Sequence, residues 1–240
     1  MLRALLWDVD GTIAETEGDG HRVAFNRAFA QAGLAWRWDL PRYGALLEVS
    51  GGRERLLHDM APRPDAPPDP AARETLARHL HRIKTAHYAR IVAEGGISAR
   101  PGVLRVMAEC AQAGIAQAIV TTTSRANVEA LFPGLLGPAW QPRFAAIVCA
   151  EDAPLKKPHP QAYAVALARL GIDPAEALAI EDSPNGLQAA AAAGVPCCIT
   201  RSLFFRWADF PGAVLVCDDL DGPPIVGLRD LSAAHAARAG

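Results

Sequence analysis

The stretch that decides the fold is Arg3-Ala4-Leu5-Leu6-Trp7-Asp8-Val9-Asp10-Gly11-Thr12. Its first five residues are mostly apolar, which is typical of a buried strand in a parallel sheet. Asp8 and Asp10 follow where this strand ends. They are two residues apart on an extended chain, so their carboxylates can lie on the same face. Gly11 then lets the backbone turn sharply. The stretch therefore predicts a strand that ends in a pair of carboxylates.

Outward from this strand, the chain from about residue 97 onward alternates short apolar runs with helical patterns. Strands are expected at 116–120, 145–149, 177–180, 196–200 and 214–217. Helices are expected at 101–113, 124–131, 160–170 and 184–193, with a loop at 133–143 and a helical tail from about residue 225. Such alternation predicts an α/β fold, with a Rossmann-like parallel sheet that is covered by helices on both faces and includes the first strand.

The part of the chain between the first strand and residue 97 has a helical pattern throughout. Helices are expected at 17–32, 39–61 and 71–94; the second is broken at Ser50-Gly51-Gly52, and a proline-rich loop at 62–70 precedes the third. We therefore expect an α-helical cap at 17–96, inserted after the first strand into a catalytic core made of residues 1–16 and 97–240.

The composition is that of an ordinary globular protein, since half of the 240 residues are apolar and 21% are charged. The net charge of −2, without a basic tail, gives no support to nucleic-acid binding. No apolar run approaches the roughly 20 residues of a membrane span, and the apolar start is too short for a signal peptide. We expect a cytoplasmic monomer with neither a nucleic-acid nor a membrane partner.

Two residue types add to this expectation. The five cysteines are odd in number and lack Cys-x-x-Cys spacing, which argues against a disulfide framework and against a structural zinc site. Only Lys84, Lys156 and Lys157 are lysines among the 24 Lys and Arg residues. In so arginine-rich a chain, a lysine indicates a position that needs a compact ammonium group.

Polar clusters follow four of the predicted strands. They are Asp8 with Asp10, Thr121-Thr122-Thr123, Lys156-Lys157 and Glu181-Asp182. Ligand sites of open parallel sheets lie at the carboxyl ends of the strands, so these clusters are expected to meet. Two close carboxylates repel each other unless a cation lies between them. We therefore expect Mg²⁺, held by Asp8, Asp10 and Asp182, because Mg²⁺ prefers carboxylate oxygens and water.

Phosphoryl transfer is the chemistry that this set of residues favours. Asp8 is expected to attack phosphorus and form an aspartyl-phosphate. Asp10, protonated part of the time, donates a proton to the leaving oxygen and then activates water as a base. Thr122 donates a hydrogen bond to the phosphoryl group, aided by backbone N–H groups at the start of the next helix. Lys157, next to Pro158, is expected to balance the negative charge, and Lys156 to be solvated.

The four clusters resemble the motifs of the haloacid dehalogenase superfamily of phosphatases. The matching residues are Asp8-Val9-Asp10-Gly11-Thr12, Thr122, Lys157-Pro158 and Glu181-Asp182-Ser183. The resemblance spans nearly the whole chain, and it implies a Rossmann-like core with a helical cap inserted after the first motif.

Within that superfamily the chain is similar to the CbbY group, phosphatases of xylulose-1,5-bisphosphate that remove an inhibitor of Rubisco, the carboxylase of the Calvin cycle. The similar stretches are residues 20–26, 50–54, 81–85 and 121–127. The resemblance implies a phosphorylated sugar as substrate. It also implies that the substrate is bound by Asp8, Glu17, His21, Ser50, Gly51, Gly52, Arg53, Glu54, His81, Arg82, Lys84, Thr121, Thr122, Thr123, Ser124 and Asn127, with Arg53, Arg82 and Lys84 as the cap cations that hold a second phosphate.

Other activities remain open on the same core. A phosphoglycolate phosphatase, another sugar-phosphate phosphatase and a β-phosphoglucomutase share the core motifs, and only the cap residues favour a sugar bisphosphate. A dehalogenase is disfavoured, because cleavage of a carbon–halogen bond needs no acid at Asp10. An inactive binding or regulatory protein is disfavoured because every catalytic position is filled.

Overall fold

A computed structural model describes residues 1–237 of the chain. Six parallel strands form one sheet in the order β3-β2-β1-β4-β5-β6. Their bounds are β1 Ala4–Trp7, β2 Ala116–Val120, β3 Ala146–Val148, β4 Ala177–Glu181, β5 Cys197–Thr200 and β6 Leu215–Cys217. In the centre of the sheet, Trp7 pairs with Ile119 on one side and with Ile180 on the other. The predicted α/β fold with a parallel sheet is confirmed.

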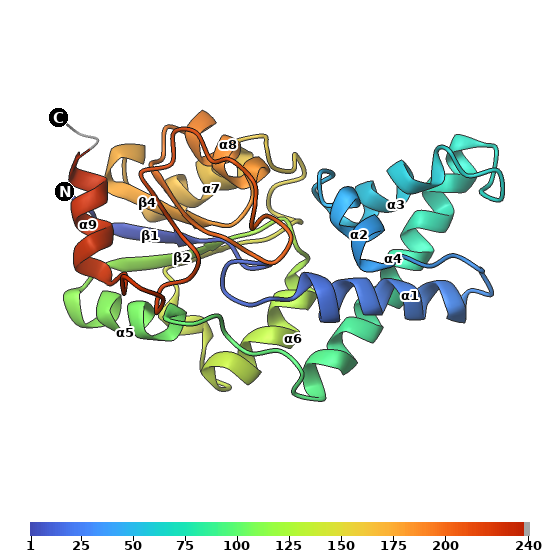
Figure 1. The fold of residues 1–240 in the computed structure, drawn as a ribbon, viewed down its shortest axis with the longest axis horizontal. Helices are drawn as coiled ribbons and strands as arrows, with labels where there is room; N and C mark the ends of the chain where they lie inside the picture. The colour runs from blue at the N-terminus through green and yellow to red at the C-terminus, as the bar shows by residue number, and fades with distance from the viewer. Residues whose placement is uncertain (238–240) are drawn as a thin grey trace.

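Helices cover both faces of this sheet, as the alternation of strands and helices predicted (Figure 1). Leu5 and Trp7 pack in one apolar cluster with α5 Val103–Ala113, α6 Arg125–Leu136 and α9 Leu228–Ala237. Ala4 and Leu6 pack in a second cluster with α7 Gln161–Leu170 and α8 Pro184–Ala192. Successive strand residues thus face opposite layers, which explains why the strands are mostly apolar.

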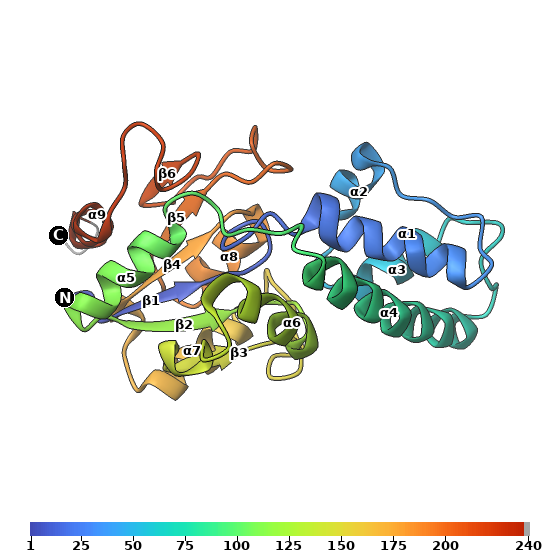
Figure 2. The same ribbon diagram turned by 90° about the horizontal axis from the view of Figure 1, so that it is seen from below.

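The helices between β1 and α5 gather at one end of the molecule, away from the sheet (Figures 1 and 2). They are a π-helical turn at Glu17–His21, α1 Arg22–Gln31, α2 Leu40–Leu46, α3 Gly52–Met60 and α4 Pro70–Ala93. Their aromatic side chains, among them Phe25, Trp38 and Tyr43, form an apolar cluster of their own. We propose that residues 17–96 are the cap and that residues 1–16 and 97–240 are the core, of which residues 238–240 lie outside the described part.

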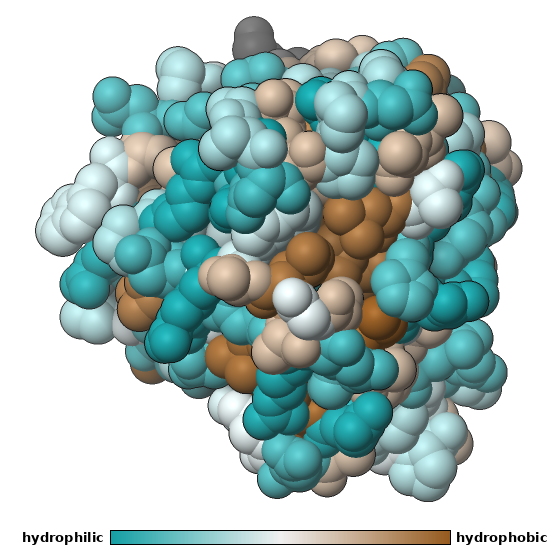
Figure 3. Space-filling model, turned by 90° about the vertical axis from the view of Figure 1, so that its right-hand side faces the viewer, coloured by the Kyte–Doolittle hydropathy of each residue, from teal (hydrophilic) through white to brown (hydrophobic). Residues whose placement is uncertain are grey.

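Two loop aromatics of the core reach the cap. Phe204, between β5 and β6, packs edge-on against Tyr43 of α2, with ring centroids 5.9 Å apart. Phe205 contacts both the second sheet cluster and the cluster of the cap. Seen from its own end, the cap presents a largely hydrophilic surface around one hydrophobic area (Figure 3). In the described residues, no helix combines the length and apolarity that a membrane span requires.

Among the element boundaries that differ from the sequence-based prediction, two have a clear structural cause. The helix expected to end at Leu131 continues to Leu136, with Pro133 inside it, because Leu135 and Leu136 still find apolar partners in the first sheet cluster. The helix expected from Pro101 begins at Val103, because Gly102 adopts a left-handed conformation, with φ of 78°. A side chain at Gly102 would collide with Leu220, so only glycine fits there.

Candidate active site

Three carboxylates meet where the two central strands end. Asp8 follows β1, Glu181 is the last residue of β4, and Asp182 comes next. Each offers an oxygen within 4.8 Å of the others, and all three residues are buried. The parallel pairing of β1 with β4 brings them together, as the strand-end argument predicted.

Lys157 lies between two of these carboxylates. Its ammonium nitrogen is 2.7 Å from Asp8 Oδ1 and 2.6 Å from Glu181 Oε1, and it also donates to the carbonyl oxygen of Val120 at 2.8 Å. The Tyr163 hydroxyl donates to the same oxygen of Glu181. One oxygen of Glu181 is therefore committed to holding Lys157 beside Asp8, which is the charge-balancing position predicted for this lysine.

Asp8 and Asp182 are buried close to other carboxylates, and their negative charges are not fully balanced by Lys157. Burial and the repulsion by Glu181 raise the pKa of Asp8 to about 8, although Lys157 opposes this rise. Burial and the repulsion by Asp8 and Glu181 hold the pKa of Asp182 well above its usual value. A divalent cation bound by oxygens would relieve this repulsion, so the donor set fits Mg²⁺.

Asp10 has hydrogen-bond partners of its own. Its carboxylate does not join the triad of Asp8, Glu181 and Asp182, and the Thr16 hydroxyl donates to its Oδ1. His21 Nε2 lies 2.9 Å from the same oxygen. The Asp10 carboxylate thus lies apart from the cluster of Asp8, Glu181 and Asp182, and the ligand set of Asp8, Asp10 and Asp182 stays a prediction.

The contacts of Asp10 favour its ionised form. Burial alone would raise the pKa of Asp10, but the nearby His21 and the hydrogen bonds from His21 and Thr16 hold it below its usual value. Lys84 lies 2.8 Å from His21 Nδ1. A lysine ammonium can only donate, so Nδ1 accepts and Nε2–H donates to Asp10. In this arrangement Asp10 is the ionised, base form.

The threonines after β2 form the opposite wall of the site. The Thr121 hydroxyl accepts from the backbone N–H of Thr123, and the Asn127 amide donates to the Thr123 hydroxyl at 2.9 Å. Ser124 caps the N-terminus of α6 through the backbone N–H of Asn127. Thr122 faces both cavities of the site. At the start of α6 the backbone N–H of Arg125 donates to the Glu151 carboxylate, and that of Asn127 donates to Ser124.

Cap and core enclose a cavity of about 290 Å³ around these groups. The predicted substrate-binding residues that line it are Glu17, His21, Gly51, Gly52, Arg53, Glu54, His81, Lys84, Thr122, Thr123, Ser124 and Asn127, together with Asp10. A smaller adjoining cavity is lined by Asp8, Ser50, Thr121, Lys157 and Asp182. The two cavities share Asp10, Glu17, Gly51, Arg55 and Thr122, so they form one continuous site.

Arg82 is the one predicted binding residue that the structure leaves outside. It is exposed and donates toward His79, in a separate hollow with Gln31 and Arg90. Lys84 lies two positions further along α4 and is buried in the site. Residues two apart on a helix do not face each other, which explains why Arg82 and Lys84 lie in different surroundings.

Two residues that line the site, Arg55 and Lys156, were assigned no role in the sequence analysis. Arg55 is buried between the cavities and donates to the Tyr43 hydroxyl at 2.8 Å, and that hydroxyl in turn donates to Glu17. Lys156, expected to be solvated, lines the larger cavity and donates to the carbonyl oxygens of Ala150 and Ala153. Its retention as a lysine was the available signal, whereas Arg55 gave none in so arginine-rich a chain.

The combination of a buried carboxylate cluster, its lysine and a helical cap agrees with the comparison to known proteins. The model of the haloacid dehalogenase-like hydrolase family matches residues 2–194. The chain belongs to the haloacid dehalogenase-like hydrolases. Within them it is a phosphatase of the CbbY-like group.

Several relatives carry this assignment. The plasmid-encoded CbbY protein of Cupriavidus necator is 47% identical over 92% of this chain and 87% of its own length. The CbbY protein of Cereibacter sphaeroides is 41% identical over 91% of this chain and 92% of its own length. The crystal structure of CbbY from Rhodobacter sphaeroides with phosphate is 39% identical, with a TM-score of 0.88, and the match covers 97% of this chain and all of that chain.

A second crystal structure similar to this haloacid dehalogenase-like hydrolase is a mutant of the Rhodobacter sphaeroides protein in complex with xylulose-(1,5)bisphosphate. It is 39% identical, with a TM-score of 0.88 over 96% of this chain and 99% of that chain. The solved relatives thus include a protein of the same fold with a bound sugar bisphosphate.

Proposed function

We propose that the chain is a Mg²⁺-dependent phosphatase that hydrolyses xylulose-1,5-bisphosphate to xylulose 5-phosphate and phosphate. The observation that carries the proposal is a site with two different ends. Asp8, Lys157 and Asp182 are buried at the core end, and the cations Arg53 and Lys84 reach the same continuous cavity from the cap. A bisphosphate has one phosphate to be cleaved and one to be held.

The first step transfers the phosphoryl group to Asp8. An oxygen of Asp8 forms a bond to phosphorus while the bond between phosphorus and the sugar oxygen breaks, which gives an aspartyl-phosphate and an alkoxide. Asp10, which takes up a proton from solvent when the substrate binds, gives that proton to the alkoxide. Asp8 and Asp182 would hold Mg²⁺, which neutralises phosphoryl oxygens and lowers the repulsion that keeps Asp8 protonated.

The second step regenerates Asp8. The ionised form of Asp10, which its contacts with Thr16 and His21 favour, takes a proton from water. The water oxygen then bonds to phosphorus, and the bond between phosphorus and Asp8 breaks. Thr122 donates to the phosphoryl oxygens, and Lys157 keeps Asp8 oriented.

Two residues on the cap side of the site, Arg53 and Glu17, support a sugar bisphosphate as the substrate. Arg53 pairs with Glu54 and Glu74 at its exposed edge, so a phosphate can compete for its guanidinium. Glu17, held by the Tyr43 hydroxyl, offers an acceptor for sugar hydroxyls between the two phosphate positions. The mutant CbbY of Rhodobacter sphaeroides, which is 39% identical to this chain, was crystallised with such a sugar bisphosphate.

The test is a panel of phosphate esters assayed for phosphate release with and without EDTA. It contains xylulose-1,5-bisphosphate, ribulose-1,5-bisphosphate, phosphoglycolate and glucose-1-phosphate. We expect the highest kcat/KM for xylulose-1,5-bisphosphate and no turnover in EDTA. Preference for phosphoglycolate, conversion of a sugar phosphate without phosphate release, or release in EDTA would each replace the corresponding part of the proposal.

A further inference from the structure

Arg100 lies where the chain returns from the cap to the core. Residue 99 forms an antiparallel bridge with Ala14, and the backbone N–H of Arg100 donates to the Ile13 carbonyl at 2.8 Å. Its side chain is almost completely buried, at 8% exposure. A buried guanidinium stays charged and is tolerated only where hydrogen bonds replace the water that it has lost.

The guanidinium of Arg100 joins three separate segments of backbone. Nη1 donates to the carbonyl oxygen of Gly11 and, at 3.0 Å, to both the carbonyl and the hydroxyl of Thr200. Nη2 donates to the carbonyl oxygens of Arg201 and, at 2.7 Å, of Asp218. Four carbonyls from the loops after β1, β5 and β6 thus converge on one side chain.

Two of these segments touch the site directly. Gly11 follows Asp10 and has a φ of 84°, and a side chain on it would collide with the Asp182 carboxylate and the Ser202 Cβ. The Gly11 peptide therefore packs directly on Asp182 and on Ser202. Since Arg100 holds the carbonyls of Gly11 and Arg201, it sets the spacing between the two loops that carry these groups.

We propose that Arg100 is a positioning residue for the phosphatase reaction, which acts by fixing the loop of Asp8 to Gly11 against Asp182 through backbone carbonyls. Its role in holding the two metal-site carboxylates rests on the proposed function. Lysine cannot replace it, because three donors on one nitrogen cannot span three segments, whereas the planar guanidinium fork can.

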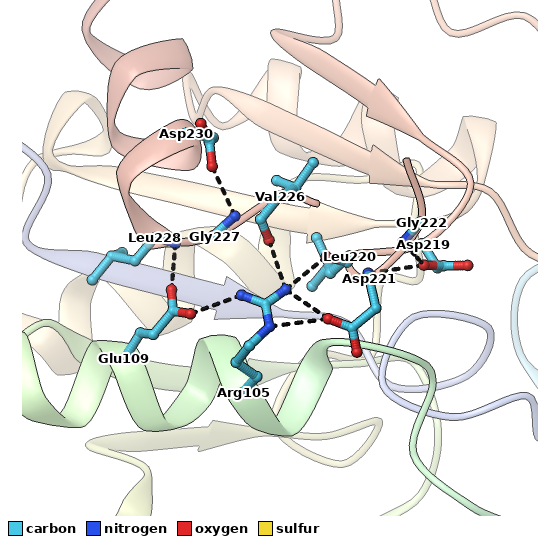
Figure 4. Close-up of polar contacts among 10 residues, drawn as sticks. All are labelled: Arg105, Glu109, Asp219, Leu220, Asp221, Gly222, Val226, Gly227, Leu228 and Asp230. Atoms are coloured by element: carbon cyan, nitrogen blue, oxygen red, sulfur yellow. Dashed lines mark hydrogen bonds and ion pairs between the residues drawn. The ribbon is translucent and has the colours of Figure 1, made fainter. Parts of the chain in front are cut away.

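Arg105 offers a matched control, because it also holds backbone segments together but lies away from the site. It lies in α5, a few residues further along, and donates to the carbonyls of Leu220 and Val226 and to the Asp221 carboxylate, while Glu109 binds both Arg105 and the backbone N–H of Leu228 (Figure 4). It also fastens the segment after β6, but it contacts no residue of the site.

The experiment compares Arg100→Lys and Arg100→Gln with Arg105→Gln in the full-length protein. We measure kcat and KM for the bisphosphate, the affinity for Mg²⁺ by calorimetry without substrate, and the melting temperature. Replacing residues that orient ligands to a metal typically costs about 10–100-fold. We expect a loss of that size in kcat and in Mg²⁺ affinity for both Arg100 variants, with a KM change below about threefold. Arg105→Gln should lower the melting temperature and leave kcat and Mg²⁺ affinity within about twofold of the wild type.

The inference is overturned if the Arg100 variants keep wild-type kcat and Mg²⁺ affinity, or if Arg105→Gln loses as much of either. Should Arg100→Gln not fold, Arg100→Lys decides by the same criteria. A wild-type protein that releases no phosphate would overturn the proposed function instead, and the calorimetric Mg²⁺ affinities would still decide whether Arg100 organises the two carboxylates.

Discussion

Replacing Lys157 with methionine tests the electrostatic centre of the site. Lys157→Met keeps most of the side-chain length and removes the ammonium group. That group lies 2.7 Å from Asp8 and 2.6 Å from Glu181, and all three side chains are buried. The substitution therefore leaves two buried carboxylates without their shared cation.

Removing one partner of a buried ion pair costs about 3–5 kcal/mol. In a chain of this length, 1 kcal/mol lowers the melting temperature by about 2–4 °C, so a fall of about 6–20 °C is expected. The loss depends on pH. With Lys157 the folded pKa of Asp8 is about 8, so the stability of the wild type falls with rising pH up to about that value; without Lys157 this pKa is higher, and the stability of the variant goes on falling where that of the wild type levels off. Urea unfolding at pH 5.5 and pH 8.5, both in EDTA, measures this difference.

Lys156→Met is the matched control. Lys156 is partly buried and donates only to the carbonyl oxygens of Ala150 and Ala153. Two such hydrogen bonds contribute about 1–3 kcal/mol at most, without the pH dependence. The reasoning is refuted if the two variants lose equal stability at pH 8.5, or if the loss in Lys157→Met does not grow between pH 5.5 and pH 8.5.

Three further substitutions or conditions give distinct outcomes. Asp8→Asn should fold normally and lose turnover, because the amide cannot form the acyl phosphate; phosphate release above about 1% of wild type would remove Asp8 as the nucleophile. Without metal, the pKa values of Asp8 and Asp182 are raised, so the folded protein binds more protons than the unfolded one. The melting temperature in EDTA should therefore fall between pH 6.5 and pH 8, and Mg²⁺ should abolish that fall. A melting temperature in EDTA that does not change with pH would contradict this prediction. Arg53→Ala should raise KM for the bisphosphate about 10–100-fold, as expected for the loss of a charged hydrogen bond, and should hardly change KM for a monophosphate. Arg82→Ala is the control and should change neither KM. Equal effects of Arg53→Ala on both substrates would exclude a role for Arg53 in binding the second phosphate.

The sequence predicted the core of the fold because local patterns determine it. Each apolar run of the sheet was located within about two residues, since strands buried on both faces leave an unmistakable apolar signal. The order of the strands was not predicted, because it depends on long-range pairing. The continuation of α6 through Pro133 was also missed, since Leu135 and Leu136 gain partners only in the folded core.

The catalytic end of the site was more predictable than its cap end. Asp8, Lys157 and Asp182 converge because parallel strands end at one edge, a rule that needs no knowledge of side-chain packing. The orientation of Asp10 depends on partners from another segment, His21 above all, so the sequence could not give it. The helical period already places Arg82 and Lys84 on different faces of α4, as the structure has them.

The contact of Phe204 with Tyr43 has a consequence for turnover. Any separation of the cap from the core returns aromatic surface to water, which is unfavourable by about 25 cal/mol for each Å² exposed. The resting enzyme is therefore biased toward a shut site before any sugar binds. Apolar hydration has a large heat capacity. If separation of the cap from the core limits kcat, the Arrhenius plot of kcat should therefore be curved, and the substitution Phe204→Ala should reduce this curvature.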